Sequence, residues 1–414
     1  MTATYANLIG GEMVTTDATL DVVNPATEQV IAQVPACGKD ELDRAVDAAR
    51  VAFESWRKTT PEERQKVVLG IAAAIKDNAD ELFRLLTSEQ GKPHAQAQQE
   101  IYGAAGLAAA QSTLTLDDVV NQDDDTRLSR TRRVPVGVVG GIVPWNFPIM
   151  MAIQKIVPAL VAGCTIVLKP SPFTPLTTLR IAELIKDVVP AGTVNIITGE
   201  DTLGPLITGH PDIDKITFTG STAVGKHLVK LAADDLKVTT MELGGHAPVM
   251  VFKDSDVDTV LDTMVGAAYR NAGQVCVSPT RFLVEEDLFP AFRDGFVERA
   301  KKIAVGNGFD KDTRMGPMAN ERGPEGLAKK IADAKNHGAK LNTGGERIGN
   351  QGFFFEPTVL SEVPTEAEIM NEEPFGPIAL INPMAGADAI IEEANRLPYG
   401  LAAYTWTNDP VLRS

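Results

Sequence analysis

Cysteine, histidine and aromatic residues are scarce in this sequence, and their scarcity excludes several classes of protein. The 414 residues include only three cysteines, Cys37, Cys164 and Cys276, which are too few for a disulfide framework. No Cys-x-x-Cys pair occurs and the five histidines lie far apart, so no metal site is expected. This pattern indicates reduced thiols, and we interpret it as a cytoplasmic location.

The sequence also lacks long apolar runs and an excess of positive charge. No apolar stretch reaches the roughly 18 residues that a membrane-spanning helix needs, and the first residues show no basic segment followed by an apolar one. With 39 basic and 55 acidic residues the net charge is −16, which argues against nucleic acid as a partner. We expect no membrane partner either, while a local pocket can still bind an anionic small molecule.

The order of the expected elements indicates an α/β fold of two or three domains. Helical spacing of apolar residues predicts helices at residues 40–56, 62–78 and 80–89. Residues 121–125 are interpreted as an acidic turn, and the alternating, basic residues 126–133 as one strand of an exposed ribbon.

From residue 134 onward, short β-branched runs alternate with helices. This repetition predicts a parallel sheet covered by helices on both faces. Strands are expected at residues 134–143, 165–169, 194–198 and 215–219, and helices at 149–162, 176–188, 202–208 and 223–233. A second α/β segment is expected from residue 247 to about 408, with strands near 249–252, 281–284 and 378–381.

Two residues have the chemistry for covalent acyl transfer. Cys276 lies in Asn-Ala-Gly-Gln-Val-Cys and could act as a thiol nucleophile, and Glu242 opens Glu-Leu-Gly-Gly and could activate water. A free cysteine is more often a buried small apolar residue. The polar and glycine-rich neighbours of Cys276 favour the reactive alternative.

Four further segments have a turn chemistry that suits a binding site, although each also has an ordinary structural interpretation. Residues 218–225 place glycines where a strand turns into a helix, which suits a diphosphate or a plain turn. Lys169 ends a predicted strand of the same sheet, where it could meet a ligand or simply be a solvated lysine at a strand end. Asn146, between two prolines, could donate to an oxyanion or cap a helix. Residues 371–377 form a rigid acidic and aromatic turn.

Together these segments resemble the aldehyde dehydrogenase superfamily over nearly the whole chain, from about residue 7 to the end. The shared motifs are PWNFP at 144–148, KPSP at 169–172, FTGSTxVG at 218–225, ELGG at 242–245, GQVC at 273–276 and EEPFGP at 372–377. The resemblance implies a Rossmann-type parallel-sheet cofactor domain, an α/β catalytic domain and a small β ribbon for oligomerisation. It also implies NAD or NADP as the cofactor.

The resemblance implies a role for each residue of the catalytic set. Cys276 would attack the aldehyde to give a thiohemiacetal, with Asn146 and the backbone N–H of Cys276 as the oxyanion hole. Hydride transfer to the nicotinamide would leave a thioester, which water activated by Glu242 would hydrolyse to a carboxylic acid. Family members that pass the acyl group to coenzyme A generally lack this glutamate, so hydrolysis is expected here.

The resemblance also implies the residues of the cofactor site. They would contact the adenine, the two riboses, the diphosphate and the nicotinamide ring. Along the cofactor they would be Trp145 beside the adenine, Lys169 at the adenosine ribose, Gly220 and Ser221 at the diphosphate, Glu373 at the nicotinamide ribose and Phe375 beside the nicotinamide ring. Gly225 and Leu243 would be further members of the site.

The sequence departs from the family pattern in three places, and the first two bear on cofactor and substrate specificity. Pro172 stands where NAD-specific members often have a glutamate, so the choice between NAD and NADP stays open. Arg270 resembles the arginine with which succinate-semialdehyde dehydrogenases hold the distal carboxylate, but Gln154 stands where their second arginine is expected. The chain also stops soon after residues 399–402, and we interpret its C-terminus as truncated relative to the family.

These observations lead to one functional prediction with stated alternatives. We expect NAD(P)-dependent oxidation of an aldehyde, with a semialdehyde such as succinic semialdehyde as the substrate and a medium-chain aliphatic or aromatic aldehyde as the alternative. A cofactor-independent thiol esterase and a non-catalytic family member are the alternatives of another class. The expected domains are a cofactor domain (1–120 and 136–242), the ribbon (121–135, lacking its C-terminal partner strand) and a catalytic domain (243–414), in a homodimer or homotetramer.

Overall fold

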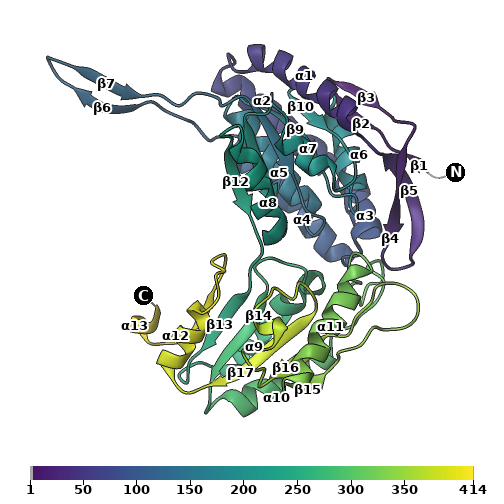
Figure 1. The fold of residues 1–414 in the computed structure, drawn as a ribbon, viewed down its shortest axis with the longest axis vertical. Coiled ribbons are helices and arrows are strands. Elements are labelled where there is room, and N and C mark those ends of the chain that lie inside the picture. Colours follow the sequence, from purple (N-terminus) through teal and green to yellow (C-terminus); the bar gives the residue numbers. More distant parts are fainter. Residues whose placement is uncertain (1–2, 414) are drawn as a thin grey trace. The chain divides into compact units, whose positions relative to one another are not determined.

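The structure, a computed structural model, describes residues 3–413, and positions 1–2 and 414 of the predicted domain ranges lie outside the described part. The chain forms two compact units (Figure 1). The first unit contains the chain up to Val23, Val30–Glu89 and Ala97–Glu242, and the second contains Asn24–Gln29, Gln90–Gln96 and the chain from Leu243 on. Two short segments from the N-terminal half therefore pack with the second unit. The assignment of cofactor binding and catalysis to separate domains stays a prediction.

The first unit is built around a seven-stranded sheet whose order is β12-β11-β8-β9-β10-β2-β3. Its first five members are parallel to one another, and β2 and β3 join antiparallel at one edge. The strands are β2 Asn7–Ile9, β3 Glu12–Val14, β8 Val138–Ile142, β9 Thr165–Lys169, β10 Val194–Ile196, β11 Lys215–Thr219 and β12 Val238–Glu242. The fold class predicted from the sequence is confirmed, with the antiparallel edge as an addition.

The order of the parallel strands reverses at β8. The chain runs from β8 to β9 and β10 on one side, and then returns to place β11 and β12 on the other side of β8. Because such crossovers are right-handed, the helices before and after the reversal cover opposite faces of the sheet. The helices are α5 Pro148–Val161 and α6 Leu176–Ile185 on one face, and α7 Leu203–Thr208 and α8 Thr222–Ala233 on the other. Ligands bind at such reversal points in open α/β sheets.

Four long helices precede this sheet in the sequence: α1 Lys39–Trp56, α2 Pro61–Asp77, α3 Ala79–Gln90 and α4 His94–Gln111. Three of them match the predicted helices to within two residues. The sequence reasoning missed α4, because its Ala- and Gln-rich sequence shows no clear apolar stripe. A smaller sheet has the order β1-β5-β4, with β1 Ala3–Thr4, β4 Thr19–Asn24 and β5 Gln29–Pro35.

The strand predicted at residues 134–143 is shorter than expected. It begins at Val138, because Gly137 has a φ of 134°, outside the strand region. A Cβ on Gly137 would lie 1.8 Å from Asp214 Oδ2, the same oxygen that accepts a hydrogen bond from the Val138 N–H at 2.7 Å. Asp214 thereby fixes the start of β8 and leaves residues 134–137 outside the sheet.

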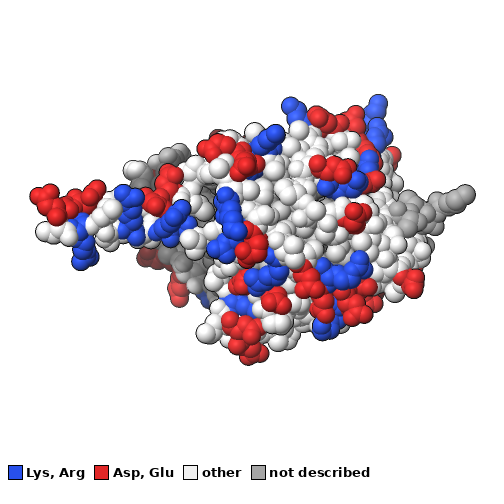
Figure 2. Space-filling view, turned by 90° about the horizontal axis from the view of Figure 1, so that it is seen from above, with Lys and Arg blue, Asp and Glu red and all other residues white. Residues whose placement is uncertain are grey.

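An antiparallel ribbon of β6 Val119–Asp123 and β7 Leu128–Thr131 projects from the first unit (Figure 1). The predicted acidic turn at 121–125 is wrong in its first part, since β6 continues through Asp123 and the turn follows Asp124. Asp124 Oδ1 accepts hydrogen bonds from the Thr126 and Arg127 N–H groups. Figure 2 shows acidic side chains at the tip of the ribbon and basic side chains along it.

The second unit contains a six-stranded sheet of order β15-β16-β17-β14-β13-β18. All neighbours are parallel except β15 and β16. Its strands are β13 Ala247–Val251, β14 Pro279–Glu285, β15 Lys340–Thr343, β16 Thr358–Ser361, β17 Ile378–Met384 and β18 Tyr404–Trp406, and its helices are α9 Val257–Tyr269, α10 Phe289–Lys301, α11 Arg322–Asn336, α12 Ala387–Asn395 and the short α13 Pro410–Arg413. Short 3-10 helices span Arg270–Gly273 (η1) and Glu368–Met370 (η2). Phe282, Phe292 and Phe296 pack against one another in its core.

Across residues 3–413, every helix is either too short or too polar to cross a membrane. The same residues contain no cluster of three or more histidine, cysteine or acidic side chains that could hold a metal ion.

Candidate active site

In the first unit, the predicted site residues lie at the carboxyl ends of four parallel strands. Trp145 and Asn146 follow β8, Lys169 ends β9, Gly220 follows β11 and Glu242 ends β12. These ends share one edge of the sheet, and the order reversal at β8 opens a crevice there. The first unit therefore gathers its predicted residues at the place where a dinucleotide fits this fold.

Asn146 does not cap helix α5. The N-cap residue is Phe147, whose side chain has no polar atom. The first amides of the helix, those of Ile149 and Met150, donate instead to Glu100 Oε1 at 3.0 and 3.2 Å. Asn146 is only 6% exposed. The capping interpretation of Asn146 is therefore wrong, and the carboxylate that takes this role comes from α4, the helix that the sequence analysis missed.

Lys169 is an unusual lysine, because its side chain is almost completely buried at the end of β9. Its residue exposure is 3%, and the Nζ atom donates to the Pro170 carbonyl at 3.4 Å. Burial lowers the pKa of Lys169 to about 8, and the charge of Asp201 partly opposes this shift. A solvated lysine at a strand end, the alternative interpretation of the sequence, is excluded by this burial.

The turn between β11 and α8 has an ordered N-terminus. Ser221 is the N-cap residue, and its side chain accepts a hydrogen bond from the Val224 N–H at 3.4 Å. The Gly220 N–H donates to the Glu242 carbonyl at 3.0 Å, which ties this turn to the end of β12. Gly225 is buried within the first turns of α8. A helix N-terminus of this kind presents N–H groups and positive dipole charge to an anion.

Glu242 lines a cavity of about 480 Å³ within the first unit. Gln154 and Lys155 of α5 lie on the same wall. Lys155 Nζ donates to Thr217 Oγ1 at 3.1 Å and Thr219 Oγ1 at 2.9 Å. Burial lowers the pKa of Lys155 to about 8, while the Glu242 charge acts in the opposite direction. The sequence analysis missed Lys155, although a lysine in the apolar sequence of α5 was a detectable signal.

In the second unit, the predicted residues lie at the amino ends of parallel strands. Leu243 precedes β13, Cys276 precedes β14, and Glu373 and Phe375 precede β17. Cys276 is partly exposed, whereas Cys37 and Cys164 are buried. Burial raises the pKa of the Cys37 thiol to about 12, so that thiol stays protonated. Exposure thus separates Cys276 from the other two cysteines.

The backbone before Cys276 adopts a rare conformation. Asn271 has φ 51° and ψ 37°, Ala272 has φ 54° and ψ 38°, and Gly273 has φ 68°. The left-handed region costs a non-glycine residue roughly 1–2 kcal/mol. Only glycine fits the third position, because a Cβ there would lie 2.0 Å from the Gly376 carbonyl oxygen. Strain of this kind persists where the surrounding structure enforces it, often at functional sites.

The segments that contain Gly245, Cys276 and Glu373 lie close together in the second unit. A Cβ on Gly245 would lie 2.3 Å from the Cys276 carbonyl oxygen, so the second glycine of the Glu-Leu-Gly-Gly motif lets the two chains meet. The Gly245 N–H donates to Glu373 Oε1 at 3.1 Å. Burial raises the pKa of Glu373 to about 7, against the lowering effect of this hydrogen bond. Phe375 takes a φ of 43° in the same loop.

Arg270, at the end of α9, is exposed and lies six residues before Cys276 in the sequence. Burial raises the pKa of the Tyr404 phenol, while the charge of Arg270 lowers it and the charge of the Cys276 sulfur raises it. The Tyr404 hydroxyl donates to the Val277 carbonyl at 2.6 Å. Arg270 and Cys276 therefore both lie near one side chain of β18. Gln154, the other predicted substrate residue, belongs to the first unit.

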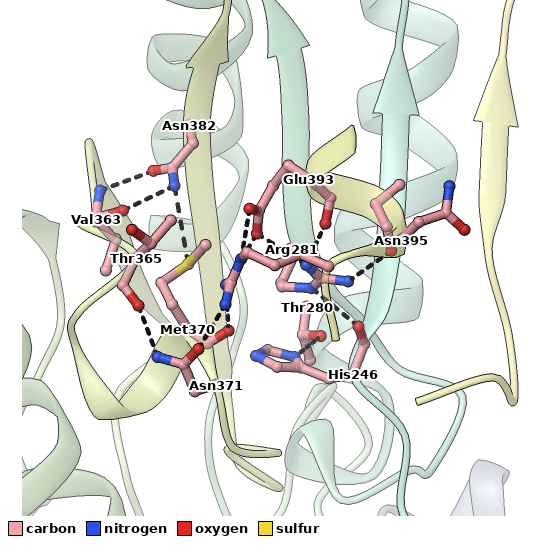
Figure 3. Close-up of polar contacts among 12 residues, drawn as sticks. His246, Thr280, Arg281, Val363, Thr365, Met370, Asn371, Asn382, Glu393 and Asn395 are labelled. Atoms are coloured by element: carbon pink, nitrogen blue, oxygen red, sulfur yellow. Dashed lines mark hydrogen bonds and ion pairs between the residues drawn. The ribbon is translucent and has the colours of Figure 1, made fainter. Parts of the chain in front are cut away.

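A polar network in the second unit connects His246, Arg281 and Glu393 (Figure 3). Arg281, 1% exposed, donates to the His246 carbonyl at 3.1 Å and to Glu393 Oε1 at 2.9 Å. Arg396 joins the other carboxylate oxygen of Glu393 at 2.7 Å and donates to the Met370 carbonyl at 3.1 Å. The network ties the chain after Gly245 to the loop that leads to Glu373.

His246 takes part in this network as a neutral ring (Figure 3). Burial, together with the positive charge of Arg281, lowers its pKa to about 3. Nε2 lies 2.9 Å from the Ile369 carbonyl and therefore donates to it, which leaves Nδ1 to accept from the Thr280 hydroxyl at 2.7 Å. The sequence showed His246 only as an isolated histidine, because its partners are 34 and 123 residues away.

Comparison with known proteins gives one consistent answer. The sequence pattern described as the aldehyde dehydrogenase family matches residues 13–412. The chain is 39% identical to 3-sulfolactaldehyde dehydrogenase of Pseudomonas putida, over 97% of this chain and 84% of that protein. It is 38% identical to the NADP(+) succinate-semialdehyde dehydrogenase GabD of Escherichia coli, over 97% of this chain and 85% of that protein. The structure of a Bacillus cereus aldehyde dehydrogenase in complex with NAD+ matches with a TM-score of 0.96 at 36% identity, covering 99% of this chain and 85% of that one.

Proposed function

Since the chain belongs to the aldehyde dehydrogenase family and is an NAD(P)-dependent enzyme of that family, we propose that its substrate is an aldehyde with an anionic group at its far end. Both relatives named above act on such compounds, one with a carboxylate and one with a sulfonate. Succinic semialdehyde is the first candidate within this class.

In the proposed reaction, Cys276 is the nucleophile. Its thiolate adds to the carbonyl carbon of the aldehyde, and the oxygen that becomes negative accepts hydrogen bonds from the Asn146 amide and the Cys276 backbone N–H. Loss of hydride from the same carbon leaves a thioester on Cys276. Glu242 then takes a proton from water, which adds to the thioester carbon and releases the carboxylic acid and the thiolate.

The residues at the strand ends of the first unit fit an NAD(P) cofactor, which accepts the hydride when bound. The buried ammonium of Lys169 can donate to ribose hydroxyls, and Trp145 can flank the adenine. The amides after Gly220, at the N-terminus of α8, can bind the diphosphate, and Ser221 orders this turn through its bond to the Val224 N–H. Gly225, a buried residue of α8, is a further proposed member of the cofactor site. Pro172 places no carboxylate against a 2′-phosphate, so both NAD+ and NADP+ are candidates.

Leu243, Glu373 and Phe375 of the second unit are the remaining residues that we propose for cofactor binding. Glu373 is held by the Gly245 N–H and can accept hydrogen bonds from the nicotinamide ribose. Phe375, in its strained backbone conformation, can lie beside the ring.

The observation that carries the choice of substrate is the place of Arg270. Arg270 opens the short helix η1 six residues before Cys276, and its charge acts on the Tyr404 phenol, whose hydroxyl donates to the carbonyl of Val277 at 2.6 Å. A positive charge therefore lies near the proposed nucleophile. A guanidinium can bind a carboxylate or sulfonate through two parallel hydrogen bonds. Gln154 supplies no second charge, and this residue favours the alternative of a neutral aliphatic or aromatic aldehyde.

The test measures reduction of NAD+ and of NADP+ with succinic semialdehyde, hexanal and benzaldehyde, in the wild type and in Arg270→Ala. Loss of a charge-assisted hydrogen bond costs about 1.5–3 kcal/mol, so KM for succinic semialdehyde should rise roughly 10- to 150-fold. KM for hexanal should change little.

Lys302→Ala is the matched control, since it removes one exposed positive charge from the same unit. Equal changes of KM for succinic semialdehyde and hexanal in Arg270→Ala would contradict the proposed anion site. Activity on esters with no requirement for NAD(P)+ would instead favour a thiol esterase.

A further inference from the structure

The left-handed turn before Cys276 is held by two glutamines from a distant part of the sequence. They belong to the segment Gln90–Gln96, which packs with the second unit although most of its neighbours in sequence belong to the first. Gln90 Nε2 donates to Asn271 Oδ1 at 3.0 Å, and the Asn271 N–H donates to Gln96 Oε1 at 2.9 Å. Both the side chain and the backbone of Asn271 are thus bound by this segment.

The two glutamines are themselves fixed in place. Gln90 is fully buried, and its Oε1 atom accepts a hydrogen bond from the Lys92 N–H at 3.0 Å. Gln96 Nε2 donates to the Arg314 carbonyl at 3.2 Å. In each side-chain amide the oxygen therefore accepts one hydrogen bond and the nitrogen donates another to a different partner, which fixes the orientation of the amide. A residue that replaced either amide with an apolar group would leave buried polar atoms of the turn without these partners.

A third glutamine closes the turn on its other side. Gln274 Nε2 donates to the Asn271 carbonyl at 2.9 Å, and Gln274 Oε1 accepts from the Ala319 N–H at 2.9 Å. Together these bonds enforce a left-handed conformation at Asn271 and Ala272, which would otherwise favour other backbone angles. Cys276 follows only two residues after Gln274, so the direction of its thiol and of its N–H depends on this turn.

We infer that Gln90 and Gln96 are positioning residues for the nucleophile: they hold the turn that aims the Cys276 thiol and N–H at the substrate carbonyl. This inference rests on the proposed role of Cys276. It assigns a function in catalysis to a segment about 180 residues away in the sequence.

The test compares Gln90→Leu and Gln96→Leu with the wild type. In each protein, the rate at which iodoacetamide alkylates Cys276 is measured by mass spectrometry of the peptide that contains this cysteine. We expect each variant to slow alkylation and to lower kcat by about tenfold, as the loss of one buried hydrogen bond would. The affinity for NADPH and the KM for aldehyde should change less than about twofold, because neither glutamine contacts the proposed cofactor residues in these bonds. Gln96→Glu keeps an acceptor for the Asn271 N–H but loses the donor to the Arg314 carbonyl, so it should alkylate faster than Gln96→Leu and more slowly than the wild type.

Two controls separate positioning from general loss of structure. Gln99→Leu, on the exposed side of α4, should alkylate at the wild-type rate. Asn271→Gly keeps a backbone suited to the left-handed turn and removes the Gln90 acceptor, so adding Gln90→Leu to it should have little further effect. Wild-type alkylation rates in both leucine variants would overturn the inference, as would additive effects of Gln90→Leu and Asn271→Gly.

Alkylation reports on the thiol whether or not the protein oxidises an aldehyde. A slow rate in Gln90→Leu, in a protein that reduces no NAD(P)+ with any aldehyde, would therefore support the positioning role while the proposed function fails. If the wild type oxidises the aldehyde while the variants are alkylated at the wild-type rate, the proposed function stands and the positioning role fails.

Discussion

At the scale of single residues, burial decides which ionisable groups can take part in chemistry. Lys169 and Lys155 are buried, with lowered pKa values of about 8, and Glu373 is partly buried, with a raised pKa of about 7. Such shifts cluster at functional sites. Glu89 shows that a structural residue can have the same property, because it is fully buried and binds the N-terminus of α6.

Glu89 gives a prediction about pH. Its pKa is raised from 4.5 to about 7, mainly by burial, so the protonated carboxyl favours the folded state. That stabilisation is complete below pH 4.5 and is lost as the pH rises through 7. At 1.36 kcal/mol per pKa unit, the contribution of Glu89 to the free energy of unfolding should fall by up to about 3 kcal/mol across this window. Glu89→Gln should remove this pH dependence.

Urea unfolding of the wild type and Glu89→Gln at several pH values between 4.5 and 8 measures the effect. The stability difference between the two proteins should shift in favour of the variant as the pH rises. Glu81→Gln, which alters an exposed carboxylate on the same helix, is the control. A constant difference across the window would show that Glu89 does not titrate there.

The site residues differ in how far the sequence could predict them. Cys276, Glu242 and Asn146 lie in short motifs, so their local neighbours already indicated chemistry. Glu100, Tyr404 and Gln90 had no such signal, because each acts through a contact with a residue 49 or more positions away. Only the folded chain brings these pairs together.

At the scale of elements, the predicted residues of the first unit lie at strand ends, and two of these strands were predicted to the residue, whereas β12, which ends in Glu242, was not predicted. The strands at residues 165–169 and 215–219 have the predicted bounds. Short β-branched runs between turn residues define such buried strands well. The start of β8 was predicted less well, because Asp214, a residue of another loop, determines it.

The network of Arg281, Glu393 and Arg396 connects α12 to the loops of the second unit. Breaking a buried ion pair by removing one partner typically costs about 3–5 kcal/mol. Glu393→Ala should therefore destabilise the fold by about 3 kcal/mol and raise the KM for the cofactor, because the Met370 segment leads to Glu373.

Thermal unfolding and cofactor titration measure the two effects. Glu392→Ala alters an exposed carboxylate of the same helix and should leave both unchanged. Equal stability of the two variants would mean that the Glu393 pair contributes nothing to the fold.

At the scale of the whole molecule, the projecting ribbon of β6 and β7 exposes apolar side chains that nothing in the single chain covers among the described residues. Val119, Val120 and Leu128 are 45%, 52% and 54% exposed on its two strands. Apolar side chains on a two-stranded ribbon are typical of contact surfaces. We expect the ribbon to take part in a homodimer or homotetramer, as the sequence predicted.

The paired substitution Val120→Glu and Leu128→Glu tests this expectation. Light scattering after size-exclusion chromatography should show a lower mass than for the wild type, because carboxylates at an apolar contact are costly to bury. Asp125→Ala at the tip of the ribbon is the control. An unchanged mass in the glutamate variant would remove the ribbon from the interface.

In the proposed reaction, Cys276 carries an acyl group that Glu242-activated water removes. The most direct measurement is the intact mass of Glu242→Gln after brief mixing with NAD(P)+ and succinic semialdehyde. We expect the mass to increase by one acyl group located on Cys276, together with a single-turnover burst of NAD(P)H. The combined Glu242→Gln and Cys276→Ser variant should show neither. A burst without an adduct on Cys276, or steady turnover of Glu242→Gln at the wild-type rate, would contradict the proposed reaction.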